Sequence, residues 1–199
     1  MFINKYLLLL PYQIKSIMKI TTQQMLKILY VLSWIIFVGV CVEAGGFIVN
    51  TFYTLVINPV DAKHFWPAVD LSGLYGWDRG YFIIETVLMC IVAVLRCCIF
   101  WLIVKILHEK KLDLYQPFNK EVGRFITSIS WLALLTGLFS WWGAKYAEWF
   151  IKQGVKMPEL QFLRIGGADV WLFMGVVLYV IAQIFKRGIE IQTENELTV

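Results

Sequence analysis

YFIIETVLMCIVAVLRCCIFWLIVKIL, the stretch from Tyr81 to Leu107, decides the fold. It is apolar over more than the roughly 20 residues that a helix needs to cross a bilayer, so it predicts a membrane-spanning helix. Two charged residues, Glu85 and Arg96, interrupt this run. A charge at such a depth costs about 2.5–3.5 kcal/mol on insertion scales, so each of the two needs a partner or water inside the protein.

The two charges lie on a different face of this helix from its aliphatic residues. Aliphatic side chains recur at steps of three and four, at Ile84, Leu88, Ile91, Leu95, Ile99, Leu102 and Ile106. Glu85 and Arg96 are about three turns apart and share another face, next to the small residues Cys90, Ala93 and Cys97. The pattern predicts that the aliphatic face contacts lipid and that the charged face contacts neighbouring helices at the centre of a bundle.

The composition is that of an integral membrane protein. Of the 199 residues, 59% are hydrophobic and 16% are charged, and the mean hydropathy is +0.69. An ordinary soluble domain has about a quarter of its residues charged. The net charge of +4 is small and does not suggest nucleic-acid binding. The four cysteines lie in apolar runs without CxxC spacing, so we interpret them as packing residues and expect no metal and no cofactor.

Three further apolar runs are long enough to span a membrane, so the predicted fold is an all-α integral membrane four-helix bundle. The predicted spans are 24–50, 81–107, 125–144 and 168–187. They form one domain, 21–188, which follows an N-terminal arm, 1–20, and precedes an acidic tail, 189–199. We interpret the arm as a loose cytoplasmic segment or an over-called start.

Four polar residues fall inside the predicted spans, namely Glu43, Glu85, Arg96 and Gln183. Glu43 shares a stripe of small residues with Gly39 and Gly46, and small residues at this spacing let helices approach closely. We predict that Glu43 and Gln183 face the bundle interior and that Glu43 pairs with Arg96 across an axial gap of about 9 Å. Glu85 lies about 16 Å from Arg96 along the axis, so we expect it to meet water or the outer loop.

The loops carry the signals for topology. The segment 59–80 is rich in Pro, Gly, Asp and aromatic residues and is predicted to form a small cap on the outer face, whereas 145–167 is amphipathic and is predicted to lie along the membrane surface. Basic residues are concentrated near both chain ends and in the middle loop, 105–124. By the positive-inside rule, both termini are predicted to be cytoplasmic.

Two segments carry a family resemblance. The ending IFKRGIEIQTENELTV, residues 184–199, and the segment QPFNKEVGRFI, residues 116–126, resemble bacterial multi-pass membrane proteins catalogued as domain of unknown function 2975. The resemblance extends from about Met18 onward. Members of this family are often encoded beside a small helix-turn-helix transcription regulator. The resemblance therefore implies a protein of the bacterial cytoplasmic (inner) membrane with a cytosolic regulator as its partner.

The tail is the predicted docking element for that partner. Its docking residues are Glu190, Glu194, Glu196, Leu197, Thr198 and Val199. Apolar and polar residues alternate here, which predicts an extended segment that adds to a sheet edge or lies in a groove. The glutamates favour a basic surface, such as that of a DNA-binding regulator. A frayed acidic end without a partner is the alternative.

We therefore expect a regulatory or sensor protein in the membrane that does not itself bind nucleic acid. We expect no enzymatic activity, because the sequence shows no nucleophile–base pair, metal-ligand set or phosphate loop. The alternative is a small oligomeric transporter or ion-pathway protein that uses Glu43, Glu85 and Arg96. Whether the chain forms a homo-oligomer stays open.

Overall fold

The computed structural model describes residues 22–109 and 119–197. Four helices in this part of the chain are long and apolar enough to span a membrane: α3 (Thr22–Val56), α5 (Arg79–His108), α6 (Lys120–Lys152) and α7 (Ala168–Leu197). Two short helices, η1 (Pro59–His64) and α4 (Ser72–Trp77), connect α3 to α5. The prediction of an all-α membrane protein with four spanning helices is confirmed. The N-terminal arm, 1–20, lies outside the described residues.

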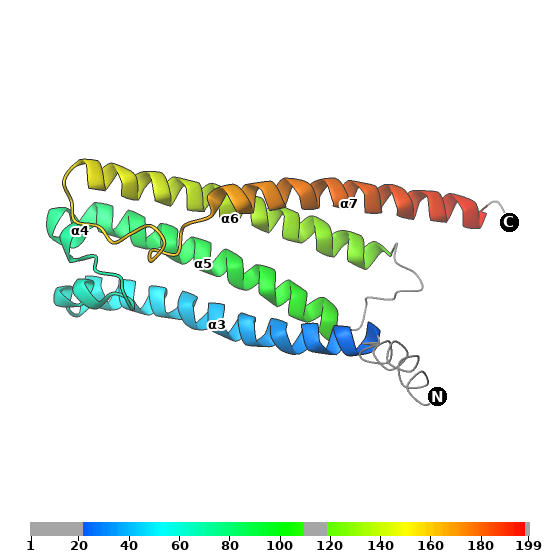
Figure 1. Cartoon of the computed structure of the whole chain (residues 1–199), viewed down its shortest axis with the longest axis horizontal. Coiled ribbons are helices and arrows are strands. Elements are labelled where there is room, and N and C mark those ends of the chain that lie inside the picture. Colours follow the sequence, from blue (N-terminus) through cyan, green and yellow to red (C-terminus); the bar gives the residue numbers. More distant parts are fainter. Residues whose placement is uncertain (1–21, 110–118, 198–199) are drawn as a thin grey trace, which may run out of the picture.

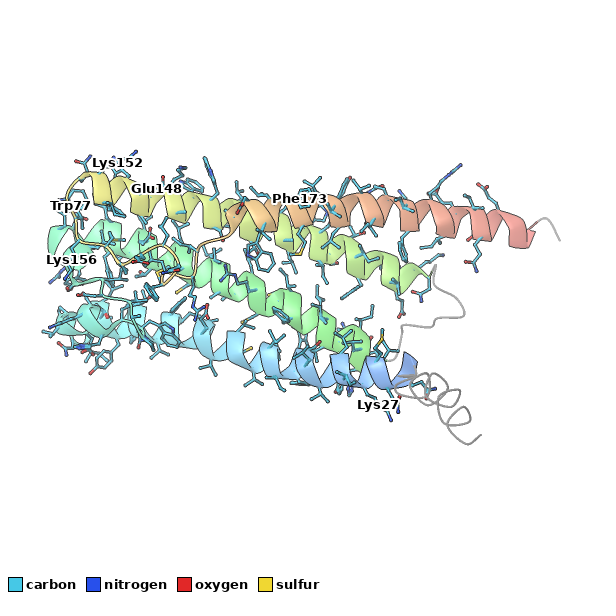
Figure 2. All side chains as sticks on the ribbon, viewed as in Figure 1. Lys27, Trp77, Glu148, Lys152, Lys156 and Phe173 are labelled. Atoms are coloured by element: carbon cyan, nitrogen blue, oxygen red, sulfur yellow. The ribbon has the colours of Figure 1, made fainter. Side chains whose placement is uncertain are left out.

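The long helices pack one against the next in chain order. α3 packs mainly on α5, α5 on α6, and α6 on α7. α3 begins and α7 ends at the same end of the bundle, here called the terminal end, while η1 and α4 lie at the opposite cap end (Figure 1). Figure 2 shows Lys27 at the terminal end and Lys152 and Lys156 at the cap end. The lateral surfaces of α3 and α7 between these ends are mostly exposed and apolar, as expected of surfaces that lipid covers.

Side-chain caps explain where α5 and α6 begin. The Asp78 carboxylate accepts hydrogen bonds from the backbone N–H groups of Gly80 at 2.6 Å and Tyr81 at 3.1 Å. The Asn119 side chain accepts one from Val122 N–H at 2.7 Å. Each cap satisfies donors that the first helical turn leaves without an intrahelical partner, so the two helix starts follow from local sequence.

The aliphatic face of α5 is not the lipid-facing surface that we predicted. Leu88, Ile99 and Ile106 are buried, although Ile84 on the same face is 44% exposed. The reason is that α5 lies between α3 and α6, so neighbouring helices cover more than one of its faces.

The cap is a folded part of the molecule with its own apolar interior. Phe65, Leu71 and Leu74 are buried in one cluster with Phe47 of α3 and Phe82 of α5. Their burial removes large apolar side chains from water and attaches the cap to the two helices that it connects.

The small-residue stripe of α3 receives this cap rather than another long helix. The Trp66 ring occupies the space that a Cβ on Gly46 would need. The Asn50 side chain donates a hydrogen bond of 2.6 Å to the Phe65 carbonyl. An added Cβ at Gly39 would meet no atom within 4 Å, so only the part of the stripe near the cap end packs closely against another segment.

The segment 145–167, predicted to lie along the membrane surface, divides at Lys152: 145–152 is the end of α6, and 153–167 enters the bundle through the buried side chains of Val155, Leu163 and Ile165. The part 153–167 forms turns rather than a helix, and Leu163 and Ile165 are completely buried. A Cβ on Gly143 of α6 would lie 3.1 Å from Ile165 Cδ1, so this segment packs directly on α6. Most other residues of 153–167 are exposed, so the contact with the bundle is made by a few apolar side chains.

α7 is displaced toward the terminal end relative to α6. Gly137 of α6 faces Leu172, and Gly175 faces Leu134, which fixes the register of the two helices. Ala168 lies one turn before Leu172 and therefore about 16 Å short of the cap end of α6. At its other end α7 passes Gly123, opposite Ile189, and continues about 7 Å beyond the start of α6. Figure 1 shows both offsets.

The predicted cytoplasmic position of the terminal end can be tested by cysteine labelling. In a variant without native cysteines, an impermeant thiol reagent applied to intact cells should label Val60→Cys and Gln153→Cys at the cap end. Thr193→Cys at the terminal end should be labelled only after lysis, because the basic residues favour that end in the cytoplasm. The opposite pattern would contradict the topology.

Candidate functional site: charged residues inside the bundle

Glu43 is paired with an arginine that sequence analysis did not single out. Arg164, from the segment that enters the bundle, places its Nε 3.7 Å from a Glu43 carboxylate oxygen. The side chain of Glu43 is 20% exposed and that of Arg164 is 56% exposed. The sequence indicated this contact only weakly: Arg164 lies two residues before the pair Gly166 and Gly167, just ahead of a predicted spanning helix.

Arg96 takes a different partner from the predicted one. Its guanidinium carbon lies 5.6 Å from the centre of the Trp171 ring, in the first turn of α7. No direct Arg96–Glu43 ion pair forms in the described structure, so that prediction is wrong. The physical reason is that Arg164 reaches Glu43, whereas Trp171 offers Arg96 a cation–π contact. Glu43 and Arg164 remain close enough to Arg96 to interact with it electrostatically.

We call Glu43, Arg96, Arg164 and Trp171 the charged cluster. Two cationic side chains face one carboxylate within a bundle that crosses a membrane. Arg164 has a φ of +58°, a left-handed conformation that is uncommon for a residue with a side chain. The Nε of Arg96 is buried without a hydrogen-bond partner in the described residues. Local strain and an unsatisfied buried donor in one place are typical of a functional position.

Glu85 is separate from this cluster and is completely buried, so it is not exposed at the surface of the protein. The expectation that it meets water or the outer loop stays a prediction. Neither of its carboxylate oxygens has a hydrogen-bond partner within the described ranges. It lies close enough to Tyr146 of α6 for the two groups to interact electrostatically. A carboxyl group buried in this way needs a proton, a cation or a water molecule to offset its lost hydration.

Gln183 does not lie in the interior, which corrects its predicted placement. It is on an exposed part of α7, where the neighbouring Ala182 faces inward and is buried. Phe173 on the same helix is 73% exposed and points away from the bundle in Figure 2. α7 packs mainly on α6, so most of its circumference has no protein neighbour in this chain.

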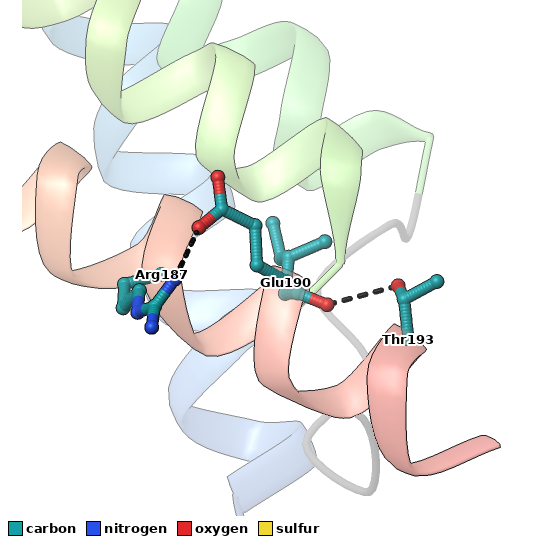
Figure 3. Close-up of polar contacts among 4 residues, drawn as sticks. Arg187, Glu190 and Thr193 are labelled. Atoms are coloured by element: carbon teal, nitrogen blue, oxygen red, sulfur yellow. Dashed lines mark hydrogen bonds and ion pairs between the residues drawn. The ribbon is translucent and has the colours of Figure 1, made fainter. Parts of the chain in front are cut away.

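As far as Leu197, the acidic tail is the last part of α7 and not an extended segment. The helix continues to Leu197, and Arg187 Nη1 donates to a Glu190 carboxylate oxygen at 3.1 Å (Figure 3). The Thr193 hydroxyl donates to the Ile189 carbonyl at 2.9 Å, one turn earlier. The predicted extended geometry is therefore wrong, because these local contacts continue the helix of the span.

Because the tail is helical, the predicted docking residues are arranged by helical rather than strand spacing. Glu190 and Glu194 are exposed and one turn apart, so they lie on the same side of α7. Glu196 and Leu197 belong to the helix, whereas Thr198 and Val199 lie outside the described residues.

A family comparison places this architecture in a known group of sequences. The model of the family described as protein of unknown function (DUF2975) matches residues 53–199. The chain belongs to this family. The match begins at residue 53, within α3. The resemblance was expected to extend from about Met18, so residues 18–52 lie outside the matched range. Comparison with curated proteins finds no match, and neither does comparison with solved structures.

Proposed function

We propose that this DUF2975 protein is a non-enzymatic regulatory or sensor protein of the bacterial cytoplasmic membrane. In this proposal, the end of α7 holds a small cytosolic helix-turn-helix regulator at the membrane. The state of the charged cluster sets the position of α7 and thereby the affinity for that regulator.

The continuity of α7 is the observation that carries this proposal. Its first turn contributes Trp171 to the charged cluster, and its last turns carry Glu190 and Glu194 and end beyond the start of α6. About 35 Å of uninterrupted helix separates Trp171 from Glu194. A rigid helix can transmit a displacement over this distance when its two ends make different contacts in two states.

The exposed charges indicate the chemistry of the partner surface. Glu190, which also pairs with Arg187, and Glu194 place two carboxylates on one side of a helix, and these favour a basic partner surface. DNA-binding regulators carry such a surface. The helical tail favours docking of a helix face or rim rather than addition of a strand to a sheet edge.

We expect charge removal from this helix to weaken partner capture. The full chain in nanodiscs should bind the proposed small helix-turn-helix regulator, and Glu190→Gln with Glu194→Gln should reduce the affinity by about tenfold at low salt, because two charge contacts are lost. The control is Glu148→Gln, an exposed glutamate near the cap end. Unchanged affinity in the tail variant would contradict docking at this surface.

The burial of Glu85 favours a second candidate function, an ion or proton pathway. A buried carboxyl group without a hydrogen-bond partner in the described structure is a typical element of intramembrane relays. On this hypothesis, the chain in liposomes conducts protons or cations above the level of empty vesicles, and Glu85→Gln abolishes that flux while the protein still inserts. Equal flux through both proteins would rule out Glu85 as the carrier of this activity.

A further inference from the structure

A pocket with balanced charges lies between α5 and α6 at the terminal end. Its volume is about 230 Å³. One wall is a face of α5 made by Leu102, Lys105, Ile106 and Glu109. The other wall is a face of α6 made by Glu121, Arg124, Phe125 and Ser128. Each wall has the spacing i, i+3, i+4, i+7, so two helical stripes face each other across the pocket.

The polar and apolar parts of the pocket are arranged for an amphiphile. Lys105 and Arg124 supply two positive charges, and Glu109 and Glu121 supply two negative charges. Leu102, Ile106 and Phe125 add an apolar surface that continues into the membrane-spanning part of the two helices.

From this arrangement we propose that the pocket binds a phospholipid whose headgroup joins a phosphate to a primary ammonium group. The phosphate lies against Lys105 and Arg124, since guanidinium and ammonium groups donate strong hydrogen bonds to phosphate oxygens. The ammonium group lies against Glu109 and Glu121. A carboxylate accepts several hydrogen bonds at once, so contacts that these glutamates make within the protein leave acceptor sites for the ligand.

The charge balance selects this headgroup over two common alternatives. A purely anionic headgroup would contact Lys105 and Arg124 but would be repelled by the like charges of Glu109 and Glu121. A trimethylammonium headgroup carries the positive charge but has no N–H to donate to a carboxylate. The primary ammonium group provides both the charge and the hydrogen-bond donors.

The position of the pocket favours a lipid over a soluble molecule with the same headgroup. It lies where two spanning helices reach their charged ends, so the headgroup level of a bilayer and the pocket coincide. Acyl chains can then follow the apolar residues of α5 and α6 toward the membrane interior. A soluble molecule would gain only the headgroup contacts.

Native mass spectrometry of the delipidated full chain in a non-ionic detergent can test this assignment. The probes are phosphatidylethanolamine, phosphatidylcholine and phosphatidylglycerol with the same short acyl chains, and soluble glycerophosphoethanolamine. We expect phosphatidylethanolamine to bind at least tenfold more tightly than each of the other three. Arg124→Gln and Glu121→Gln should each remove most of this preference, whereas Lys145→Gln, on an exposed residue near the cap end, should leave it intact.

Three outcomes would overturn the proposal. Equal binding of the three lipids would show that the pocket does not recognise the headgroup. Tighter binding of phosphatidylglycerol would show that the glutamates do not contribute an ammonium site. Binding of glycerophosphoethanolamine as tightly as the lipid would assign the site to a soluble ligand. None of these results depends on whether α7 holds a regulator.

Discussion

Gly137→Leu should destabilise the protein by about 3 kcal/mol, because α6 and α7 approach too closely for a side chain at this position. A Cβ there would lie 2.6 Å from Leu172 Cγ and 2.8 Å from the Leu172 backbone nitrogen. The backbone nitrogen cannot move aside without displacing α7. The measurement is the free energy of unfolding of the full chain in mixed micelles, followed by circular dichroism.

A matched substitution separates this steric effect from a general effect of losing glycine. Gly45 is an exposed helical glycine of α3, and an added Cβ there meets nothing within 4 Å. Gly45→Leu should therefore be neutral or stabilising by up to about 1 kcal/mol, since leucine favours a helix over glycine. Similar losses in Gly45→Leu and Gly137→Leu would contradict the close approach of α6 and α7.

Glu43→Leu should cost roughly 1–3 kcal/mol, because it leaves Arg164 and Arg96 without their carboxylate. The estimate is below the 3–5 kcal/mol of a fully buried pair, since the Arg164 side chain is 56% exposed. Arg164→Leu in the same chain should recover part of the loss, which gives a coupling energy of about 1 kcal/mol in a double-mutant cycle. The measurement is again the free energy of unfolding.

The same cycle with Arg96→Leu in place of Arg164→Leu is the control. Arg96 makes no direct ion pair with Glu43 within the described structure and contacts Trp171 instead. The coupling between Glu43 and Arg96 should therefore be smaller than that between Glu43 and Arg164. The reverse order would show that Arg96 is the true partner of Glu43.

The spans were predictable because their signal is local. The run that contains Glu85 and Arg96 exceeds the bilayer thickness, so no knowledge of neighbours is required to recognise it. The start of α6 was predictable for the same reason: Asn119 caps the helix by accepting a hydrogen bond from a backbone N–H only three residues away.

The charged cluster could not be predicted because it depends on where a loop goes. The sequence places Glu43 and Arg96 at compatible depths, but it does not show that Leu163 and Ile165 draw the chain into the bundle. Their burial delivers Arg164 to Glu43. Short apolar pairs beside glycines also occur in surface loops, so composition alone does not distinguish a loop that enters the bundle from one that stays on the surface.

The tail was wrongly predicted to be extended because the prediction used its short alternating pattern without the helix that precedes it. Ile189 and Ile191 alternate with polar residues, which is the period of a strand. However, they continue a long helix, and Ile189 packs near Gly123 of α6. Propagating an existing helix requires no new nucleation, and this favoured the helical form.

The central claim is that the charged cluster controls partner binding through α7. The most direct test is the affinity of the full chain in nanodiscs for the proposed helix-turn-helix regulator, compared between the unaltered protein and Glu43→Gln, which preserves the side-chain volume. Coupling energies between distant sites are typically about 1–3 kcal/mol, so we expect the affinity to change at least fivefold although the substitution is far from the docking surface. An unchanged affinity, in a variant that inserts and folds normally, would contradict the coupling and leave α7 as a passive anchor.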